Sequence, residues 1–258
     1  MDGFIKAVII GTGNVATQMA KAMPLHGFCV TQVFGHTLEH AEALAKRLGA
    51  SFTNNPAQLN TTADIYLYAV SDTALPDVVA ALPPCEGIHL HTSGTMPMSV
   101  FETHQNHYGV LYPLQSFSKE AHIQWNEVPF FVEANSDLTL REVRSVAHRL
   151  SAVVYDADSD TRRILHLAGV LTNNFSNALY AMAGELLNEK GLPFKVLLPL
   201  LQQSVEKLQT LTPHEAQTGP ALRGDYAVTN AHEAMLASHP RWQTIYRLLT
   251  EEIRETHG

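Results

Sequence analysis

One short segment near the amino terminus constrains the fold of this chain more than any other. The apolar run Ala7–Ile10 leads into Gly11-Thr12-Gly13-Asn14-Val15-Ala16, and a helical pattern follows. Gly11 permits a tight turn, Gly13 lets a pyrophosphate approach the backbone, and Ala16 is small enough for close packing of helix on strand. The free N–H groups at the start of the helix favour phosphate. The segment therefore predicts a dinucleotide-binding βαβ unit, with a ligand-free turn as the alternative.

The composition excludes several other classes of protein. Of the 258 residues, 45% are hydrophobic and 16% are charged, which is enough to bury a sizeable core. The formal net charge of −8 and the lack of a Lys/Arg run argue against nucleic acid and anionic membranes as partners. No apolar stretch reaches the ~18 residues of a membrane span, and no leader-like segment precedes the first strand. With only Cys29 and Cys85, no disulfide framework is expected. We therefore expect a cytoplasmic protein.

Strand-like and helix-like patterns alternate through the first part of the chain, which is typical of parallel strands with crossover helices. Helices are expected at Thr17–His26, Thr37–Leu48 and Leu138–Leu150, and also after the strands that end at Val70 and His91. The expected strands are Ile5–Ile10, Cys29–Phe34, Asp64–Val70, Gly87–His91, Tyr108–Tyr112, Phe130–Glu133 and Val153–Tyr155.

From about Asp158 onward the strand patterns stop. Four or five helices are expected there, interrupted at Gly191-Leu192-Pro193, Thr212-Pro213, Gly219-Pro220 and His239-Pro240. We therefore predict an α/β fold. Residues 1–156 form a Rossmann-like, doubly wound and mostly parallel sheet that binds NAD(P), and residues 157–258 form an all-helical substrate and dimerisation domain.

The end of the second strand bears on the choice of cofactor. NAD sites usually carry Asp or Glu about 20 residues past the glycines, whereas this strand ends Phe34-Gly35-His36-Thr37. No carboxylate is present to repel a 2′-phosphate, and His36 and Thr37 can donate hydrogen bonds to one. The sequence therefore favours NADP over NAD, although a plain loop is the alternative role for His36.

Polar residues follow the later strands, where open α/β sheets bind their ligands. We expect Val70 and Ser71 beside the cofactor and Ser93 near its nicotinamide end, with a hydroxyl available to the substrate. His89 and His91 alternate on one strand and so point to the same face. A metal pair is one interpretation, but no third ligand follows at a suitable spacing, so no metal is expected.

A long helix is expected from Thr161 to Glu189. Placing its residues at 100° intervals gives an apolar stripe of Ile164, Ala168, Leu171, Phe175, Ala178, Met182 and Leu186. The opposite side carries a polar band of His166, Gly169, Asn173, Asn177 and Tyr180. Because the flanks are also apolar, we expect a largely buried helix. The polar band must then face either other polar groups or a ligand-lined cleft.

Five segments carry a resemblance to a known family. They are Gly11–Ala16, His91–Gly94, Tyr112–Phe117, Leu167–Asn177 and Gln217–Asp225. In these segments the chain resembles the NADP oxidoreductases that join a Rossmann-like amino-terminal domain to an all-helical carboxyl-terminal domain of unknown function. The resemblance spans nearly the whole chain. It implies kinship with deazaflavin-dependent NADP reductases, pyrroline-5-carboxylate reductases and β-hydroxyacid dehydrogenases, and a helical domain of the 6-phosphogluconate dehydrogenase C-terminal type.

The resemblance breaks at one position that matters for catalysis. The β-hydroxyacid dehydrogenases use a Lys four residues before an Asn on the corresponding helix to polarise the reacting oxygen, and here Asn173 stands four residues before Asn177. An amide cannot transfer a proton as an ammonium group can. Alcohol oxidation by that mechanism therefore requires His166 or another titratable group instead, whereas an imine that arrives protonated demands less.

Together these residues predict an NADP-dependent oxidoreductase. It transfers hydride between the nicotinamide and a small organic substrate (an imine, a keto acid or a deazaflavin) in the cleft between the domains. His166, Asn173 and Asn177 are expected to orient the substrate. Arg223 either binds a substrate carboxylate or holds the loop that carries it.

The sequence also bears on two other functions. The absent lysine favours a non-catalytic dinucleotide-binding sensor or scaffold protein. An S-adenosylmethionine-dependent methyltransferase is disfavoured, because no acidic residue stands just before the glycines and an all-helical domain follows. In each case the helical domain is expected to form a homodimer, since its long helix needs more cover than about 100 residues supply.

Overall fold

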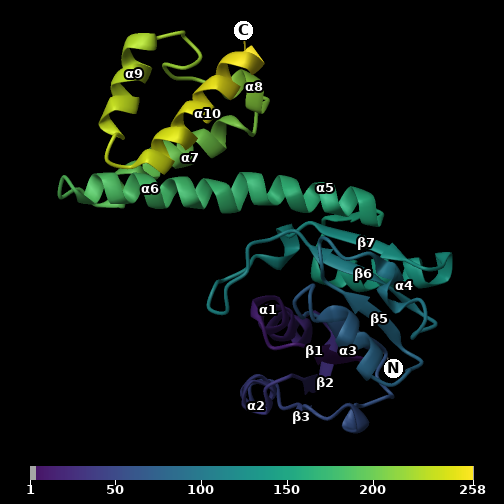
Figure 1. The fold of residues 1–258 in the computed structure, drawn as a ribbon. Coiled ribbons are helices and arrows are strands. Elements are labelled where there is room, and N and C mark those ends of the chain that lie inside the picture. Colours follow the sequence, from purple (N-terminus) through teal and green to yellow (C-terminus); the bar gives the residue numbers. More distant parts are fainter. Residues whose placement is uncertain (1–3, 258) are drawn as a thin grey trace. The chain divides into compact units, whose positions relative to one another are not determined.

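The computed structural model describes residues 4–257. A sheet of eight strands organises the amino-terminal part of the chain, and Figure 1 shows this sheet with its helices. The strand order is β3-β2-β1-β4-β5-β6-β7-β8, and neighbours are parallel except β6 and β7. The order changes direction between β1 and β4, which is where such sheets bind ligands. The strands are β1 (Ile5–Ile10), β2 (Phe28–Phe34), β3 (Ser51–Thr53), β4 (Ile65–Tyr68), β5 (Ile88–His91), β6 (Tyr108–Pro113), β7 (Phe130–Ala134) and β8 (Val154–Asp156).

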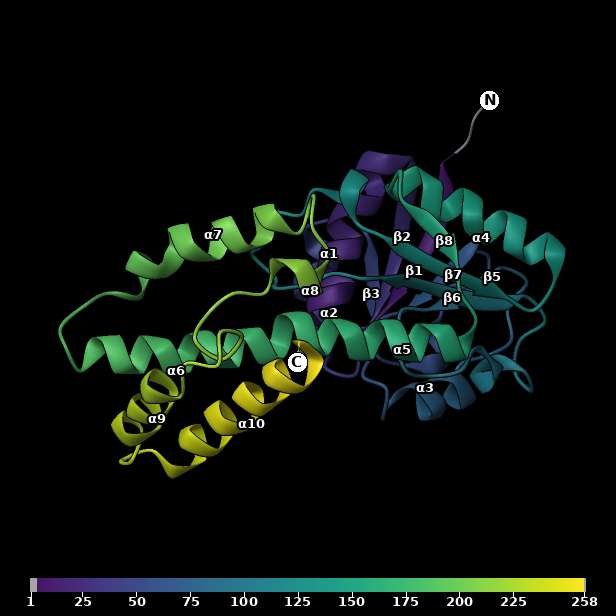
Figure 2. The ribbon, with the colours of Figure 1, turned by 90° about the horizontal axis from the view of Figure 1, so that it is seen from above.

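Helices cover both faces of this sheet, as Figure 2 shows for α3 and α4. One face packs against α1 (Asn14–Ala22), α2 (Leu38–Lys46) and α4 (Asp137–Leu150). The other packs against α3 (Leu75–Ala81) and the 3₁₀ turn Met98–Phe101. Residues Ala7–Ile10 of β1 and Ile65–Tyr68 of β4 are therefore buried on both sides of the sheet, which explains why these runs contain no charged residue.

The predicted Rossmann-like fold is confirmed, with differences in detail. The seven expected strands are all present, and β3 was missed because it is only three residues long. The helix expected after β5 is wrong. The chain instead forms a polar turn and the short 3₁₀ turn after Pro97, which has no N–H to donate and disfavours helical geometry at Met96.

The helix expected at Thr17–His26 has different limits. The α1 helix begins at Asn14, and after Ala22 it tightens into the 3₁₀ turn Met23–His26. Pro24 lies in that turn, and Gly27 ends it with a φ of 85°, in the left-handed region that favours glycine.

Helices make up the carboxyl-terminal part of the described chain. The α5 helix (Ser159–Gly169) continues through a π-helical segment, Val170–Phe175, into α6 (Ser176–Asn188). The remaining helices are α7 (Leu198–Lys207), α8 (Pro213–Ala216), α9 (Tyr226–Met235) and α10 (Pro240–His257). In the part of the chain that the structure covers, no helix combines the length and apolar character needed to cross a membrane.

The chain divides into two compact units, Met1–Asn173 and Asn174–Gly258. The last strand ends at Asp156, yet α5 belongs to the first unit by its packing. The domain division at residue 156 stays a prediction.

The expectation of a largely buried long helix is wrong for the single chain. Ile164 is 67% exposed, Leu171 is 52% exposed and Phe175 is 55% exposed. In addition, the π-helical segment has a wider turn than an α-helix, so a stripe drawn at a constant 100° does not continue through it. The apolar side chains of the predicted stripe are present, but these three are largely exposed.

Candidate cofactor and active site

The glycine turn after β1 has the geometry that its sequence predicts. Gly11 has a φ of 126°, and a Cβ there would overlap the carbonyl oxygen of Ala69 at the end of β4. Gly13 is exposed, and a Cβ at that position would meet no atom within 4 Å. The first glycine is therefore needed by the fold, whereas the second leaves open space above the backbone where a pyrophosphate fits.

The start of α1 leaves its amide groups available. Gly13 is the N-cap residue, and no side chain caps the helix, so the N–H groups of the first turn have no partner within the helix. The Asn14 side chain instead donates to the carbonyl oxygen of Phe117 at 3.0 Å, and thereby holds the loop after β6 against α1. Ala16 is fully buried and packs in the sheet core, while Val15 packs beside it.

A pocket of about 470 Å³ adjoins this turn at the carboxyl ends of the strands. Six residues predicted for the cofactor line it: Gly11, Thr12, Gly13, His36, Val70 and Ser71. Asn54 and Asp77 also line it and were not predicted. The other predicted cofactor residues, Asn14, Val15, Ala16, Thr37 and Ser93, do not contribute to its lining.

The end of β2 carries no acidic side chain over Phe34–Thr37. Gly35 is required by packing, because a Cβ there would lie 2.9 Å from Thr12 Cγ2 and 3.1 Å from Ala41 Cβ. His36 is exposed at the pocket, and Thr37 is the N-cap residue of α2 without a side-chain capping bond. The His36 imidazole is thus available to an anion at this end of the pocket, and the uncapped start of α2 follows it directly in the chain.

The turn after β5 is fixed by its own side chains. Ser93 Oγ accepts hydrogen bonds from the backbone N–H of Thr95 at 3.1 Å and of Met96 at 2.9 Å. The Thr95 hydroxyl donates to the Asp72 carboxylate, which joins the loops after β4 and β5. The Ser93 oxygen therefore stabilises its own turn, and the role of its hydroxyl toward cofactor or substrate stays a prediction.

A buried arginine, which the sequence did not single out, holds α5 to this turn. The side chain of Arg162 is fully buried and donates to the carbonyl oxygens of Ser93 at 3.1 Å and Met96 at 2.6 Å. It also forms an ion pair with Glu133 of β7 at 2.6 Å. A signal was present, because Arg162 shares a helical face with Leu165, His166 and Gly169, whereas the exposed Arg163 does not.

His166 lies one turn further along α5, at the ends of β5 and β6. A Cβ at Gly94 would lie 2.6 Å from His166 Nδ1, so the imidazole ring occupies the space over this glycine. Tyr112 at the end of β6 places its hydroxyl 3.2 Å from the same Nδ1 atom. The predicted His166 is thus brought together with the segments Ser93-Gly94 and Tyr112–Phe117, all within the first unit.

The two strand histidines are core residues. His89 and His91 are both fully buried; the Tyr68 hydroxyl lies 2.9 Å from His89 Nδ1, and His91 Nδ1 accepts from the N–H of Ser93. Burial lowers the pKa of His89 to about 4 and that of His91 to about 3, so both are neutral at pH 7. Among residues 4–257 they have no third His, Cys, Asp or Glu placed to share a metal ion.

Three further predicted residues are not joined to this site by the structure. Asn173 is exposed in the π-helical segment, while Asn177 in α6 and Arg223 in the turn before α9 are exposed in the second unit. Their roles toward the substrate stay predictions.

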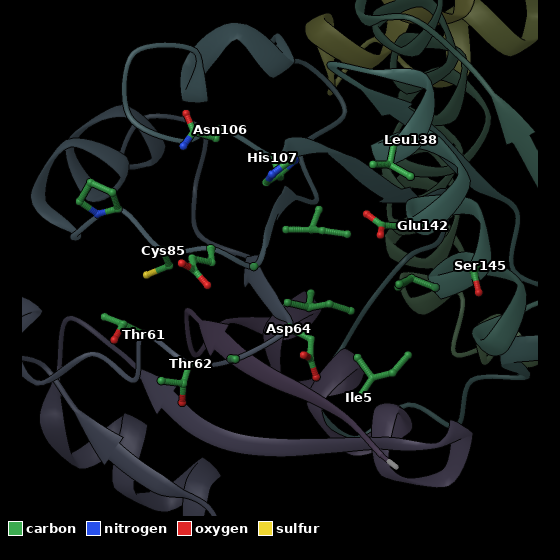
Figure 3. Close-up of a pocket in the computed structure, with 17 residues that line it drawn as sticks. Ile5, Thr61, Thr62, Asp64, Cys85, Asn106, His107, Leu138, Glu142 and Ser145 are labelled. Atoms are coloured by element: carbon green, nitrogen blue, oxygen red, sulfur yellow. The ribbon is translucent and has the colours of Figure 1, made fainter. Parts of the chain in front are cut away.

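A larger cavity, of about 1280 Å³, lies at the opposite edge of the sheet (Figure 3). Ile5, Asp64 and Gly87 line it near the amino ends of β1, β4 and β5, facing Leu138 and Glu142 of α4. The Asp64 carboxylate already accepts a hydrogen bond from the Lys6 amide at 2.7 Å. Parallel sheets bind ligands at the carboxyl ends of their strands. The smaller pocket at the glycine turn is therefore the better candidate for the cofactor site.

Two family models match the chain. Residues 6–88 match the model described as NADP oxidoreductase, coenzyme F420-dependent, and residues 128–253 match a domain of unknown function, DUF2520. No curated protein is significantly similar to the chain in sequence.

Solved structures with similar folds are numerous. A protein of Bacteroides fragilis assigned as an NADP oxidoreductase is 42% identical, with a TM-score of 0.92, and the match covers 99% of this chain and 100% of that one. A reductive aminase from Aspergillus terreus, in complex with NADPH and ethyl levulinate, is 16% identical (TM-score 0.75; 99% and 95% covered). The 1-pyrroline-5-carboxylate reductase of Streptococcus pyogenes is 14% identical (TM-score 0.69; 99% and 100% covered). The latter two share the fold.

Proposed function

The chain belongs to the NADP oxidoreductases that carry a carboxyl-terminal domain of unknown function, and from this premise we propose that it reduces or oxidises a small organic substrate with NADP(H). The observation that carries the proposal is the pocket at Gly13, where a Cβ would meet no atom within 4 Å beside the free amides of α1. These amides would hold the pyrophosphate, since the start of a helix favours negative charge. Thr12, Val70 and Ser71 line the rest of this end of the pocket.

The residues after β2, where the adenosine ribose of a dinucleotide would lie, support NADP as the cofactor. His36 and Thr37 replace the acidic residue of a typical NAD site, and both can donate hydrogen bonds to a 2′-phosphate. The absence of a side-chain cap on α2 leaves the Thr37 hydroxyl free for that role. Asp77 lines the pocket from α3, not from the end of β2.

When bound, NADP(H) supplies the hydride donor or acceptor at its nicotinamide ring. The chain must supply the proton and the orientation, and His166 is the residue that we assign to the proton. It is half-buried over Gly94 at the ends of β5 and β6, which continue the sheet from the pocket edge at Ser71. Asn173, Asn177 and Arg223 remain candidates for orienting the substrate, and the expected cleft between the domains stays a prediction.

The substrate class follows from the proton that the chain can offer. Asn173 cannot donate a proton as the lysine of β-hydroxyacid dehydrogenases does, so His166 must act as the acid. A histidine acid is suited to the reduction of an imine or a keto acid. A deazaflavin is a third candidate substrate. The fold shared with a reductive aminase and a pyrroline-5-carboxylate reductase supports the imine first.

A screen of NADPH oxidation with imines, 2-keto acids and an oxidised deazaflavin tests the proposal. We expect turnover with at least one class, abolished by His166→Ala while NADPH binding is kept. His148→Ala, which changes an exposed histidine of α4, is the control and should act as wild type. NADPH binding without turnover of any of these substrate classes would contradict the proposed enzymatic activity and support a dinucleotide-binding sensor or scaffold.

We also propose that the protein is a cytoplasmic homodimer formed through its helical part. Side chains that a second copy would cover are exposed in the single chain, including Leu200 and Val205 of α7 at 64% each and Met235 of α9 at 76%. Light scattering at micromolar concentration is expected to give twice the chain mass. A monomer would contradict the dimer and leave the cofactor proposal untouched.

A further inference from the structure

Tyr112 is buried at the end of β6, with only its hydroxyl near a polar partner. The residue is 7% exposed, and its ring packs against Phe131 of β7 with the ring centroids 6.3 Å apart. Its hydroxyl lies 3.2 Å from Nδ1 of His166. A phenylalanine would pack equally well in this place, so packing alone does not account for the hydroxyl.

Three residues restrain the position of the His166 imidazole: two lie next to the ring, and one anchors its helix. Gly94 lies beneath it, and Tyr112 approaches Nδ1. Arg162, one turn earlier, fixes α5 to the turn after β5 through two backbone carbonyl oxygens. Among the residues that the structure describes, the other ring nitrogen, Nε2, forms no hydrogen bond, and the side chain remains half-buried. One nitrogen is therefore engaged by the protein and the other is left for a ligand.

We propose that Tyr112 is a positioning residue for His166: its hydroxyl oxygen accepts a hydrogen bond from Nδ1–H, so that Nε2 is the nitrogen that exchanges a proton with the substrate. This inference rests on the proposed oxidoreductase function, in which His166 supplies the proton. It adds a residue to that site and fixes which atom of the imidazole acts.

The chemistry balances with Tyr112 unchanged throughout. Reduction of a C=N or C=O bond adds to carbon the hydride, with its two electrons, that the cofactor supplies, and adds one proton to nitrogen or oxygen. The proton leaves Nε2 of the imidazolium, which becomes neutral with its remaining proton on Nδ1, and a proton from solvent restores it. The hydrogen bond made by one ring nitrogen sets which nitrogen keeps the proton in the neutral ring, so acceptance by the Tyr112 oxygen keeps it on Nδ1 and leaves Nε2 to transfer the other proton.

The phenol is suited to this role because it keeps its own proton. Burial raises the pKa of Tyr112, an effect that the Arg162 guanidinium only partly opposes. Asp72 raises it further. At neutral pH the group is therefore an uncharged hydroxyl, whose oxygen can accept a hydrogen bond from either the neutral or the charged imidazole.

The test compares Tyr112→Phe with the matched variant Tyr155→Phe. Tyr155 of β8 also stacks on Phe131, with the ring centroids 5.5 Å apart. It is exposed, and among the described residues the tyrosine that is hydrogen-bonded to His166 is Tyr112, not Tyr155. The ¹⁵N chemical shifts of the imidazole in histidine-labelled protein report the tautomer without any substrate. We expect neutral His166 to carry its proton on Nδ1 in wild type and in Tyr155→Phe, and to lose that preference in Tyr112→Phe.

If Tyr112→Phe does not fold, the wild-type spectrum still tests the inference. A neutral His166 imidazole that carries its proton on Nε2 would overturn the proposed role of Tyr112. An unchanged tautomer in a folded Tyr112→Phe variant would overturn it as well. With a substrate from the screen, Tyr112→Phe should lower kcat about tenfold or more while the Kd for NADPH stays unchanged. A wild-type protein that binds no NADPH would instead overturn the proposed function, and the catalytic role of Tyr112 with it.

Discussion

The ring of His166 occupies the place of a side chain at Gly94, with Nδ1 2.6 Å from the point at which a Cβ would lie. No flexible atom can give way, because the neighbour is the body of the imidazole. Gly94→Ala should therefore displace His166. We expect turnover to fall at least tenfold and stability to fall by about 1–3 kcal/mol, with the Kd for NADPH nearly unchanged. Steady-state kinetics, urea unfolding and a cofactor titration measure the three effects.

The control for this variant is Gly184→Ala in α6. A Cβ there would make an ordinary contact, 3.6 Å from the Phe194 ring, and alanine favours a helix over glycine by up to about 1 kcal/mol. We expect unchanged turnover and equal or slightly higher stability. Full activity in Gly94→Ala would contradict a catalytic His166 held in this position.

The two glycines of the amino-terminal turn should respond differently to the same substitution. Gly11→Ala combines a φ of 126° with an overlap at Ala69, and we expect it to cost about 2 kcal/mol or more of unfolding free energy. Gly13→Ala has space and an ordinary φ of −75°, so we expect its stability to stay within about 0.5 kcal/mol of wild type. Its affinity for NADPH should nevertheless fall tenfold or more. Normal NADPH binding by Gly13→Ala would place the pyrophosphate elsewhere.

Two adjacent arginines offer a comparison of buried and exposed charge. Arg162→Met leaves Glu133 without its cation and two carbonyl oxygens without donors, so we expect a loss of about 3–5 kcal/mol. Arg163→Met removes an exposed partner of Asp160 and should cost less than about 1 kcal/mol. Chemical denaturation of both variants measures the difference. Equal losses would show that Arg162 does not anchor α5 to the sheet.

The buried histidines make stability depend on pH. The pKa of His89 is about 4 in the folded state, below its ordinary value of 6.5, so the unfolded chain binds more protons between these values. Stability from this group is therefore fully present above pH 6.5 and falls as the pH drops toward 4, by at most about 1.4 kcal/mol per pH unit. His91 acts in the same direction, down to about pH 3.

His89→Phe tests this dependence because it keeps an aromatic ring beside Tyr66, which stacks on His89 at 4.6 Å. The free energy of unfolding of the variant should fall less steeply than that of wild type between pH 6.5 and 4. Urea titrations at several pH values, followed by the fluorescence of Trp125 in a Trp242→Phe background, report on the sheet. Parallel pH profiles for variant and wild type would refute the contribution of His89.

Seven of the eight strands and the glycine turn could be predicted from the sequence because their signals are local. Continuous apolar runs such as Ala7–Ile10 and the order Gly11, Gly13, Ala16 each specify their own backbone geometry. The cap of α4 is also local, since Ser136 accepts a hydrogen bond from the N–H of Thr139 three residues later, although the sequence analysis did not predict it. The 3₁₀ turn after β5 shows the limit of this reasoning, because Pro97 altered a segment that otherwise fitted the alternating pattern.

The candidate active site was only partly predictable because its contacts join distant segments. His166 was identified from its place in a polar band. Tyr112 entered only as part of a segment that resembles the family, and Arg162 was not singled out although it shares a helical face with His166, because their partners lie far away in the sequence. The two hydrogen bonds that Ser93 Oγ accepts from the amides of its own turn were not predicted either, and its role toward the substrate stays a prediction. The burial of the long helix was wrong because periodicity identifies an apolar face without showing what covers it.

The most direct test of the NADP assignment is a calorimetric titration of the wild-type protein with NADPH and, separately, with NADH. The pocket at Gly13 and the donors His36 and Thr37 predict saturable binding of both, with NADPH bound at least tenfold more tightly, a difference of about 1.4 kcal/mol. The absence of saturable binding for either nucleotide, or tighter binding of NADH, would contradict it.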